Sequence, residues 1–310
     1  MPSLGHHALV LLLHAMRRRR IYASAKSLQR GIAQVRRTGP AAPPAPGAAL
    51  SVGRQELAGH PVFTLAPARP VQAPRPVLYL HGGGYARPIT QQHWGFLAWL
   101  VRTTGCEVTV PLYPLAPEST CTDTLAWVHA VHAQLATQHA PEAIHLMGDS
   151  AGGGLALALA QNLRDAGQPP AAQMVLITPW VDVAVPYPAA VHTARRDPML
   201  ALAGVREAGR LYAGALPLDH PAVSPAWGDV AGLPPMTVFV ATRDLLGHDA
   251  LAFAERVQQA GGALELHRGE GLVHVWPLLP VPEARAARAA IARRLAQLRS
   301  GAGGEVLFNK

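Results

Sequence analysis

The sequence contains little of what marks several specialised classes of protein. Only two of its 310 residues are cysteine, Cys106 and Cys121, too few for a disulfide framework or a cysteine-rich metal site. Such sparse cysteine suits a reducing compartment, so we expect a cytoplasmic protein, with a single bridge between the two left open. The apolar run at residues 8–13 is far shorter than the roughly 20 residues that cross a bilayer.

Acidic residues are missing from the start of the chain. Residues 1–39 hold eight of the 27 basic residues and no Asp or Glu, whereas residues 40–310 carry no net charge. The net charge of +8 is therefore local, and no nucleic-acid-binding motif or aromatic stacking pattern accompanies it. We expect no nucleic-acid partner. The segment indicates an amphipathic helix that packs on the domain or at most touches a membrane surface weakly.

Strand and helix patterns alternate along the rest of the chain, in which 49% of all residues are apolar. Such alternation predicts an α/β fold with a mostly parallel sheet and helices on both faces. The expected strands are 77–80, 107–110, 143–147, 174–177, 236–241 and 263–267. The expected helices are 93–101, 122–138, one following 150, 201–212, 250–260 and 283–298.

Two proline-rich stretches interrupt this alternation. Residues 38–50 read as a linker, so we assign 1–50 to an N-terminal cap helix and linker. Residues 183–226 form a cap insertion, a candidate lid, within a catalytic domain at 51–300. Residues 301–310 are assigned to a flexible tail, because their end resembles a protease-site remnant.

The segment 148–152 has the pattern G-x-S-x-G. An apolar stretch suited to a buried strand precedes it, and a run of Ala and Leu suited to a helix follows. A strand–turn–helix would hold the hydroxyl of Ser150 exposed at a sharp bend, which is typical of a nucleophile. The alternative is a glycine-rich helix start that packs closely on a strand.

A serine nucleophile needs a base and a carboxylate that orients it. Asp244 and His274 both follow expected strands, so we place them at the same sheet edge as Ser150, in the order Ser–Asp–His. Asp249 competes with Asp244, and His248 ranks well below His274, because both lie near an expected helix start.

A glycine loop, Gly82–Gly84, follows the strand at 77–80. Its backbone could approach a substrate closely and, with the amide of Ala151, supply an oxyanion hole. His129 and His132 share one helix face, yet no third ligand is evident nearby. We therefore expect a surface face there and no metal site.

Together these motifs resemble the hormone-sensitive-lipase family of α/β-hydrolase esterases, over about residues 70–280. The motifs are HGGGY (81–85), YPLAPE (113–118), GDSAGGG (148–154), PWVD (179–182), TRDLL (242–246) and GLVHVWP (271–277). The resemblance implies a serine carboxylesterase that needs no cofactor, with a cap built from the N-terminal segment and the insertion. Family members often form homodimers.

Residue by residue, the resemblance implies specific roles. Ser150 is the nucleophile, His274 the general base and acid, and Asp244 the orienting carboxylate. The oxyanion donors are Gly83, Gly84 and Ala151, Gly82 shapes the turn, and His81 and Glu118 hold loops in place. The chain departs from the family where Asp249 stands one place later than the usual second acid, which leaves Asp244 unaffected.

The sequence leaves the substrate open. We expect short- to medium-chain carboxylic esters, with an amide-directed hydrolase (a formamidase or deacetylase) and a non-catalytic small-ligand receptor as alternatives. Five side chains are candidates either for pocket walls or for core packing: Tyr85, Trp94, Trp180, Tyr212 and Leu272.

Overall fold

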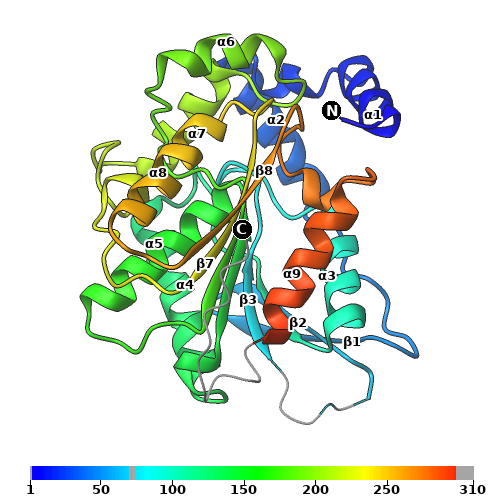
Figure 1. The fold of residues 1–310 in the computed structure, drawn as a ribbon, viewed down its shortest axis with the longest axis vertical. Helices are drawn as coiled ribbons and strands as arrows, with labels where there is room; N and C mark the ends of the chain where they lie inside the picture. The colour runs from blue at the N-terminus through cyan, green and yellow to red at the C-terminus, as the bar shows by residue number, and fades with distance from the viewer. Residues whose placement is uncertain (1, 70, 72–74, 298–310) are drawn as a thin grey trace.

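One eight-stranded sheet forms the centre of the protein (Figure 1). The structure, a computed structural model, describes residues 2–69, 71 and 75–297, so the expected tail at 301–310 lies outside the described residues. The strand order is β1-β2-β4-β3-β5-β6-β7-β8. The strands are β1 Ser51–Leu57, β2 His60–Ala66, β3 Pro76–Leu80, β4 Glu107–Pro111, β5 His145–Asp149, β6 Gln173–Ile177, β7 Met236–Ala241 and β8 Leu264–Gly269.

All strand pairs from β4 to β8 are parallel, which confirms the predicted mostly parallel α/β sheet. Every residue of β3, β5, β6 and β7 is buried, because helices cover both sheet faces and the strands can be apolar throughout. The predicted strand 143–147 lies two residues later, since Pro141–Ala143 forms a 3-10 turn, η2.

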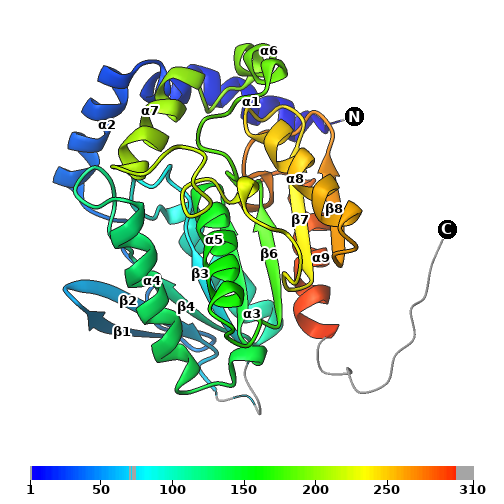
Figure 2. The same cartoon turned by 90° about the vertical axis from the view of Figure 1, so that its left-hand side faces the viewer.

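The helices lie on both faces of the sheet (Figure 2). Helices α3 and α9 pack on one face, whereas α4, α5 and α8 cover the other. The α-helices are α1 Leu4–Ala15, α2 Ala25–Thr38, α3 Gln91–Thr104, α4 Cys121–Ala136, α5 Ala151–Asp165, α6 Pro188–Arg196, α7 Leu202–Ala213, α8 Gly247–Gln259 and α9 Ala284–Gln297. Short 3-10 helices are η1 Arg18–Tyr22, η3 Pro225–Trp227 and η4 Trp276–Leu278. None of the helices in the described part of the chain is both long and apolar enough to cross a bilayer.

Sequence patterns missed the hairpin of β1 and β2, which pair antiparallel at the sheet edge. Strand β1 carries charged residues and is mostly exposed, so no apolar alternation marks it. Its turn is Ala58-Gly59, both at positive φ (46° and 80°), a conformation that suits a two-residue hairpin.

A helical layer lies at the carboxyl end of the parallel strands and is formed by two segments far apart in sequence, residues 4–38 and 188–213 (Figures 1 and 2). The second segment holds two helices where one was predicted, because Pro188 begins α6 at the first helical position, where proline is favoured. The segments pack closely: a Cβ on Gly204 would lie 2.4 Å from the backbone of Tyr22.

This close contact predicts a large effect for a single methyl group. We expect Gly204→Ala to destabilise the protein by about 1–3 kcal/mol, because α7 must move away from η1. Gly95→Ala is the matched control: its Cβ would meet nothing within 4 Å, so the better helix propensity of alanine should leave stability unchanged or raised. Urea unfolding measures both. Equal effects of the two variants would contradict the close packing of the layer.

Candidate active site

Ser150 lies in the sharp turn between β5 and α5. Its φ is 50°, a left-handed value that non-glycine residues rarely adopt. Neither of the flanking glycines, Gly148 and Gly152, has room for a side chain. A Cβ on Gly148 would lie 2.3 Å from the carbonyl oxygen of Gly152, and a Cβ on Gly152 would lie 1.9 Å from that of Leu80. The turn is therefore the predicted strand–turn–helix, with the serine at the carboxyl end of β5.

Backbone hydrogen bonds hold this conformation in place. The Ser150 N–H donates to the carbonyl of Ile177 at the end of β6 (2.9 Å), and the Ser150 carbonyl accepts from the Trp180 N–H (2.8 Å). A strained residue persists only where its surroundings fix it, and here the next strand and its loop do so.

Three side chains predicted to act together lie in hydrogen-bond contact. His274 Nε2 lies 2.8 Å from Ser150 Oγ, and His274 Nδ1 lies 2.7 Å from Asp244 Oδ2. All three residues are buried. Because Nδ1 donates to the carboxylate, Nε2 is left free to accept the serine proton.

The competing residues lie elsewhere. His248 Nε2 contacts the hydroxyl of Thr193 at 2.9 Å instead of the serine. Neither carboxylate oxygen of Asp249 has a hydrogen-bond partner among the described residues. Burial raises the pKa of Asp249 to about 8, and the nearby carboxylates of Asp182 and Asp244 add to the rise. Asp249 therefore holds a proton near neutral pH.

His274 is tuned toward the charged form. Burial alone would lower its pKa, but the carboxylate of Asp244, with smaller contributions from Asp197 and Asp149, outweighs burial and raises the pKa above the ordinary 6.5. The site thus stabilises an imidazolium, the species formed when histidine takes a proton from serine.

Asp197 was missed by sequence reasoning, although it lies against the loop that follows Asp244. It is fully buried and accepts hydrogen bonds from the N–H groups of Leu245 (2.9 Å), Leu200 (2.9 Å) and Met199 (2.7 Å). Burial, followed by the charge of Asp244, raises the pKa of Asp197 to about 6. Asp197 thereby joins the end of α6 to the Asp244 loop, a long-range contact with no local sequence signal.

The glycine loop faces the same turn. Gly83 and Gly84 have φ of 137° and 63°, which only glycine adopts readily. No acceptor within the described residues bonds the N–H groups of Gly83, Gly84 and Ala151. Gly82 differs, because its N–H donates to Asp149 Oδ1 (2.9 Å). Gly82 is therefore occupied with shaping the turn and is not available as an oxyanion donor.

Asp149, the residue before the serine, is a second acid that sequence reasoning did not single out. Besides the Gly82 N–H, it accepts from the Tyr79 hydroxyl (2.6 Å) and lies 3.2 Å from His93 Nε2. The Thr90 N–H donates to His93 Nδ1, which leaves the N–H on Nε2 to donate to Asp149. Burial would raise the pKa of Asp149, but His93 and the other donors hold it below its usual value.

His81 and Glu118 contact the loops that the resemblance assigned to them. His81 stacks on Tyr113 with ring centroids 4.4 Å apart, and the Tyr113 hydroxyl donates to the His81 carbonyl. Glu118 forms an ion pair with Arg36 of α2 (2.8 Å). Arg36 also donates to the carbonyls of Ala86 and Ala116. The helical layer is thereby tied to the segment that follows the glycine loop.

Three of the five proposed pocket side chains form one buried stack. The centroid of the Tyr85 ring lies 3.6 Å from the centroid of the Tyr212 ring and 5.5 Å from that of the Trp180 ring. Trp94 does not join them: its indole N–H donates to Ala41, and its ring meets Phe63 edge-on.

Trp94 and Leu272 both belong to the hydrophobic core that packs α3 and α9 on the sheet. Of the two alternatives for these side chains, pocket wall and core packing, their contacts agree with core packing, on the face of the sheet opposite α5. Their apolar character alone could not distinguish the two locations.

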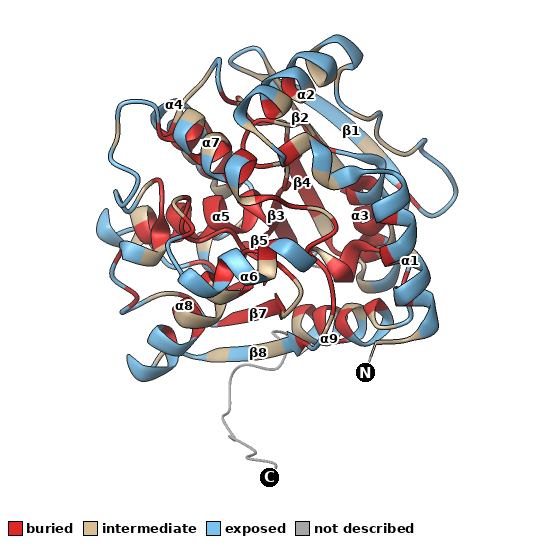
Figure 3. Cartoon of the chain, turned by 90° about the horizontal axis from the view of Figure 1, so that it is seen from above, coloured by how far each residue is buried: buried red, intermediate tan, exposed pale blue. Residues whose placement is uncertain are grey.

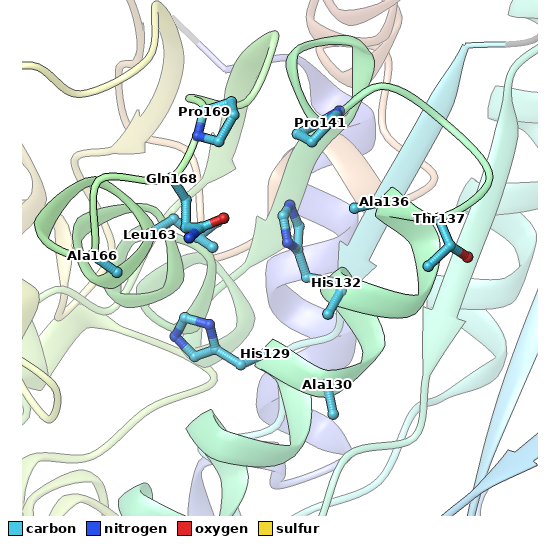
Figure 4. Close-up of a pocket in the computed structure, with 11 residues that line it drawn as sticks. His129, Ala130, His132, Ala136, Thr137, Pro141, Leu163, Ala166, Gln168 and Pro169 are labelled. Carbon is cyan, nitrogen blue, oxygen red and sulfur yellow. The ribbon is translucent and has the colours of Figure 1, made fainter.

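A separate cavity of about 570 Å³ lies between α4 and α5 (Figure 4). It is lined by His129 and His132 and by none of the residues of the serine site. The expected surface face is wrong for His132, which is buried beside the loop after α5. In the described ranges, no group of three or more His, Cys, Asp or Glu is arranged to hold a metal ion.

Comparison with known proteins agrees with this geometry. A family described as the alpha/beta hydrolase fold matches residues 77–278. The chain is 38% identical over 221 residues to an acetyl-hydrolase of Streptomyces hygroscopicus, covering 69% of this chain and 73% of that one. It is 32% identical over 220 residues to the esterase LipI of Mycobacterium tuberculosis, covering 67% and 68%. A solved esterase of the bacterial hormone-sensitive lipase family matches with a TM-score of 0.79 and 30% identity, covering 95% and 98%.

The chain therefore belongs to the α/β-hydrolase fold family and is a hydrolase of the esterase and lipase type. Within that fold it is a member of the hormone-sensitive-lipase family, as the motifs predicted.

The unpartnered carboxyl of Asp249 predicts how stability depends on pH. Its pKa of about 8 in the folded protein exceeds the ordinary 3.8, so the folded state keeps a proton that the unfolded chain releases. Stability should therefore fall as pH rises from about 4 to 8. Asp249→Asn removes this loss, and we expect its advantage over wild type to grow by more than about 1 kcal/mol across that window.

Urea unfolding at several pH values measures this advantage. Asp219→Asn, at an exposed carboxylate, is the matched control and should show no such growth. A constant difference between Asp249→Asn and wild type would contradict a protonated Asp249.

Proposed function

We propose that the protein is a serine carboxylesterase that hydrolyses short- to medium-chain esters through an acyl-enzyme on Ser150. The observation that carries the proposal is the position of His274, 2.8 Å from the serine hydroxyl and 2.7 Å from Asp244. The relative named an esterase supports an ester over an amide as substrate. The relative named an acetyl-hydrolase supports a short acyl group. The intact histidine argues against a non-catalytic receptor.

Acylation begins with attack of Ser150 Oγ on the ester carbonyl carbon, while the serine proton moves to His274 Nε2. Asp244 stabilises the imidazolium, and the carbonyl oxygen becomes an oxyanion. The N–H groups of Gly83, Gly84 and Ala151 are proposed to bind that oxyanion. The carbon–oxygen bond to the alcohol then breaks, and His274 returns the proton to the leaving alcohol.

Deacylation repeats the chemistry with water as the nucleophile. His274 takes a proton from the water as it attacks the acyl carbon. The tetrahedral intermediate then collapses, Ser150 Oγ leaves and regains its proton from His274, and the carboxylic acid is released.

We further propose that the helical layer acts as the cap of this site, with residues 1–50 and 183–226 contributing. A Cβ on Gly84 would lie 3.3 Å from the Tyr22 hydroxyl of η1 and 3.8 Å from Ala208 of α7. Both segments of the layer thus reach the glycine loop, and the stack of Tyr85, Trp180 and Tyr212 supports a wall on that side. A cytoplasmic location is proposed on the two free, buried cysteines.

Ser150→Ala tests the reaction directly. With p-nitrophenyl esters of graded chain length, we expect kcat/KM to fall by at least about 10⁴-fold, because no other group supplies the nucleophile. Wild type should prefer short to medium chains and act far more slowly on matched anilides. Ser51→Ala, at an exposed serine, should keep wild-type activity. Equally slow hydrolysis by wild type and Ser150→Ala would rule out the esterase.

The charge of Asp197 should set the acidic limb of the pH profile. The base must be neutral His274, whose pKa is raised above 6.5, so kcat/KM should fall as pH drops through that raised value. Asp197→Asn removes a negative charge, and we expect the limb to move to lower pH. Asp165→Asn, at an exposed carboxylate, should leave it in place. A change in rate at an unmoved limb would assign Asp197 a purely structural role.

A further inference from the structure

Helix α1 presents apolar side chains to solvent as well as to the protein. Its inner side packs Val10 and Leu13 in a small core with Val273 and Leu279. On the outer side, large apolar side chains remain uncovered in the described part of the chain. Their exposed fractions are 88% for Leu4, 70% for Leu11, 53% for Leu12 and 54% for Met16.

The outer side chains of α1 lie on neighbouring sides of the helix. Leu4 and Leu11 are seven residues apart, two turns along one side of the helix, and Leu12 and Met16 lie next to them at i, i+4 spacing. Helix α6 and the residue before it add Tyr187 and Val191, which are 43% and 45% exposed. Both helices lie on the outer surface of the helical layer (Figure 3). We call these six residues the apolar stripe.

Basic residues border the stripe. Exposed arginines follow α1 directly, at Arg17, Arg18 and Arg20, and two more end α6, at Arg195 and Arg196. Residues 1–50 contain no acidic side chain to neutralise them. None of the five arginines forms an ion pair among the described residues.

From this combination we infer that the apolar stripe docks the protein on an anionic phospholipid surface. The apolar side chains enter the boundary between headgroups and acyl chains, and the arginines meet the lipid phosphates. At 12 residues, α1 is too short to span a bilayer and lies along its surface.

Charge argues against a second copy of the chain as the occupant. Two copies that met through their stripes would bring Arg17, Arg18 and Arg20 of each against a surface that is equally basic. An anionic lipid surface instead supplies the complementary charge. The docked orientation turns the helical layer, and the sheet edge beneath it, toward the membrane.

Vesicle co-sedimentation tests the inference. At low salt, we expect the protein to pellet with vesicles of equal parts phosphatidylcholine and phosphatidylglycerol and not with phosphatidylcholine alone, and to be released at high salt. Leu11→Ser/Leu12→Ser should weaken binding by at least about tenfold through the apolar part of the contact. Arg18→Glu/Arg20→Glu should weaken it similarly through the charge.

Matched controls lie outside the helical layer. Leu218→Ser and Arg102→Glu change an exposed leucine and an exposed arginine and should bind like wild type. Ser150→Ala should also bind fully, which separates docking from hydrolysis. Thermal unfolding confirms that each variant is folded.

Three results would overturn the inference. The first is no binding to anionic vesicles at low salt, and the second is equal binding by the stripe variants and wild type. The third is a wild-type dimer in light scattering that becomes a monomer in Leu11→Ser/Leu12→Ser, because that result would make a second copy the occupant.

Discussion

The close approach of α5 to the end of β3 is the constraint on which the rest of the site depends. A Cβ on Gly152 would lie 1.9 Å from the Leu80 carbonyl, so the helix can reach the strand only without a side chain there. The contact puts Ser150 beside the loop that starts at His81. Asp149, just before Ser150, then accepts a hydrogen bond from the Gly82 N–H. Asp149 and Gly152, on either side of the serine, thus hold the nucleophile beside the glycine loop.

Four of the buried aspartates in and around this site differ in their hydrogen-bond partners. Asp149 has three hydrogen-bond donors, and Asp244 contacts His274 and accepts from a backbone N–H. Asp197 is held by three amides, whereas Asp249 has no partner among the described residues and keeps its proton. The carboxyl groups of Asp244, Asp197 and Asp149 all act on the imidazole of His274. Backbone N–H groups supply most of the hydrogen bonds to these three carboxyl groups.

Local patterns predicted the parts of the site that depend on local geometry. The turn at Ser150 follows from two glycines between an apolar strand and an Ala/Leu helix. Asp244 and His274 follow from their places after strands, which share one edge in a parallel sheet. Contacts that join distant segments left no such pattern. Asp197 reaches Leu245 across 48 residues, and the indole N–H of Trp94 reaches the Ala41 carbonyl across 53.

The ion pair of Arg36 with Glu118 bears on the order in which the chain folds. Arg36 is synthesised long before the loop at Glu118, and η1 long before Gly204 of α7, so the first segment can complete its docking only after β6 has been synthesised. Contacts of such large sequence separation form slowly. Until these partners have emerged from the ribosome, the first 38 residues cannot dock fully, and their leucines and arginines stay exposed to solvent.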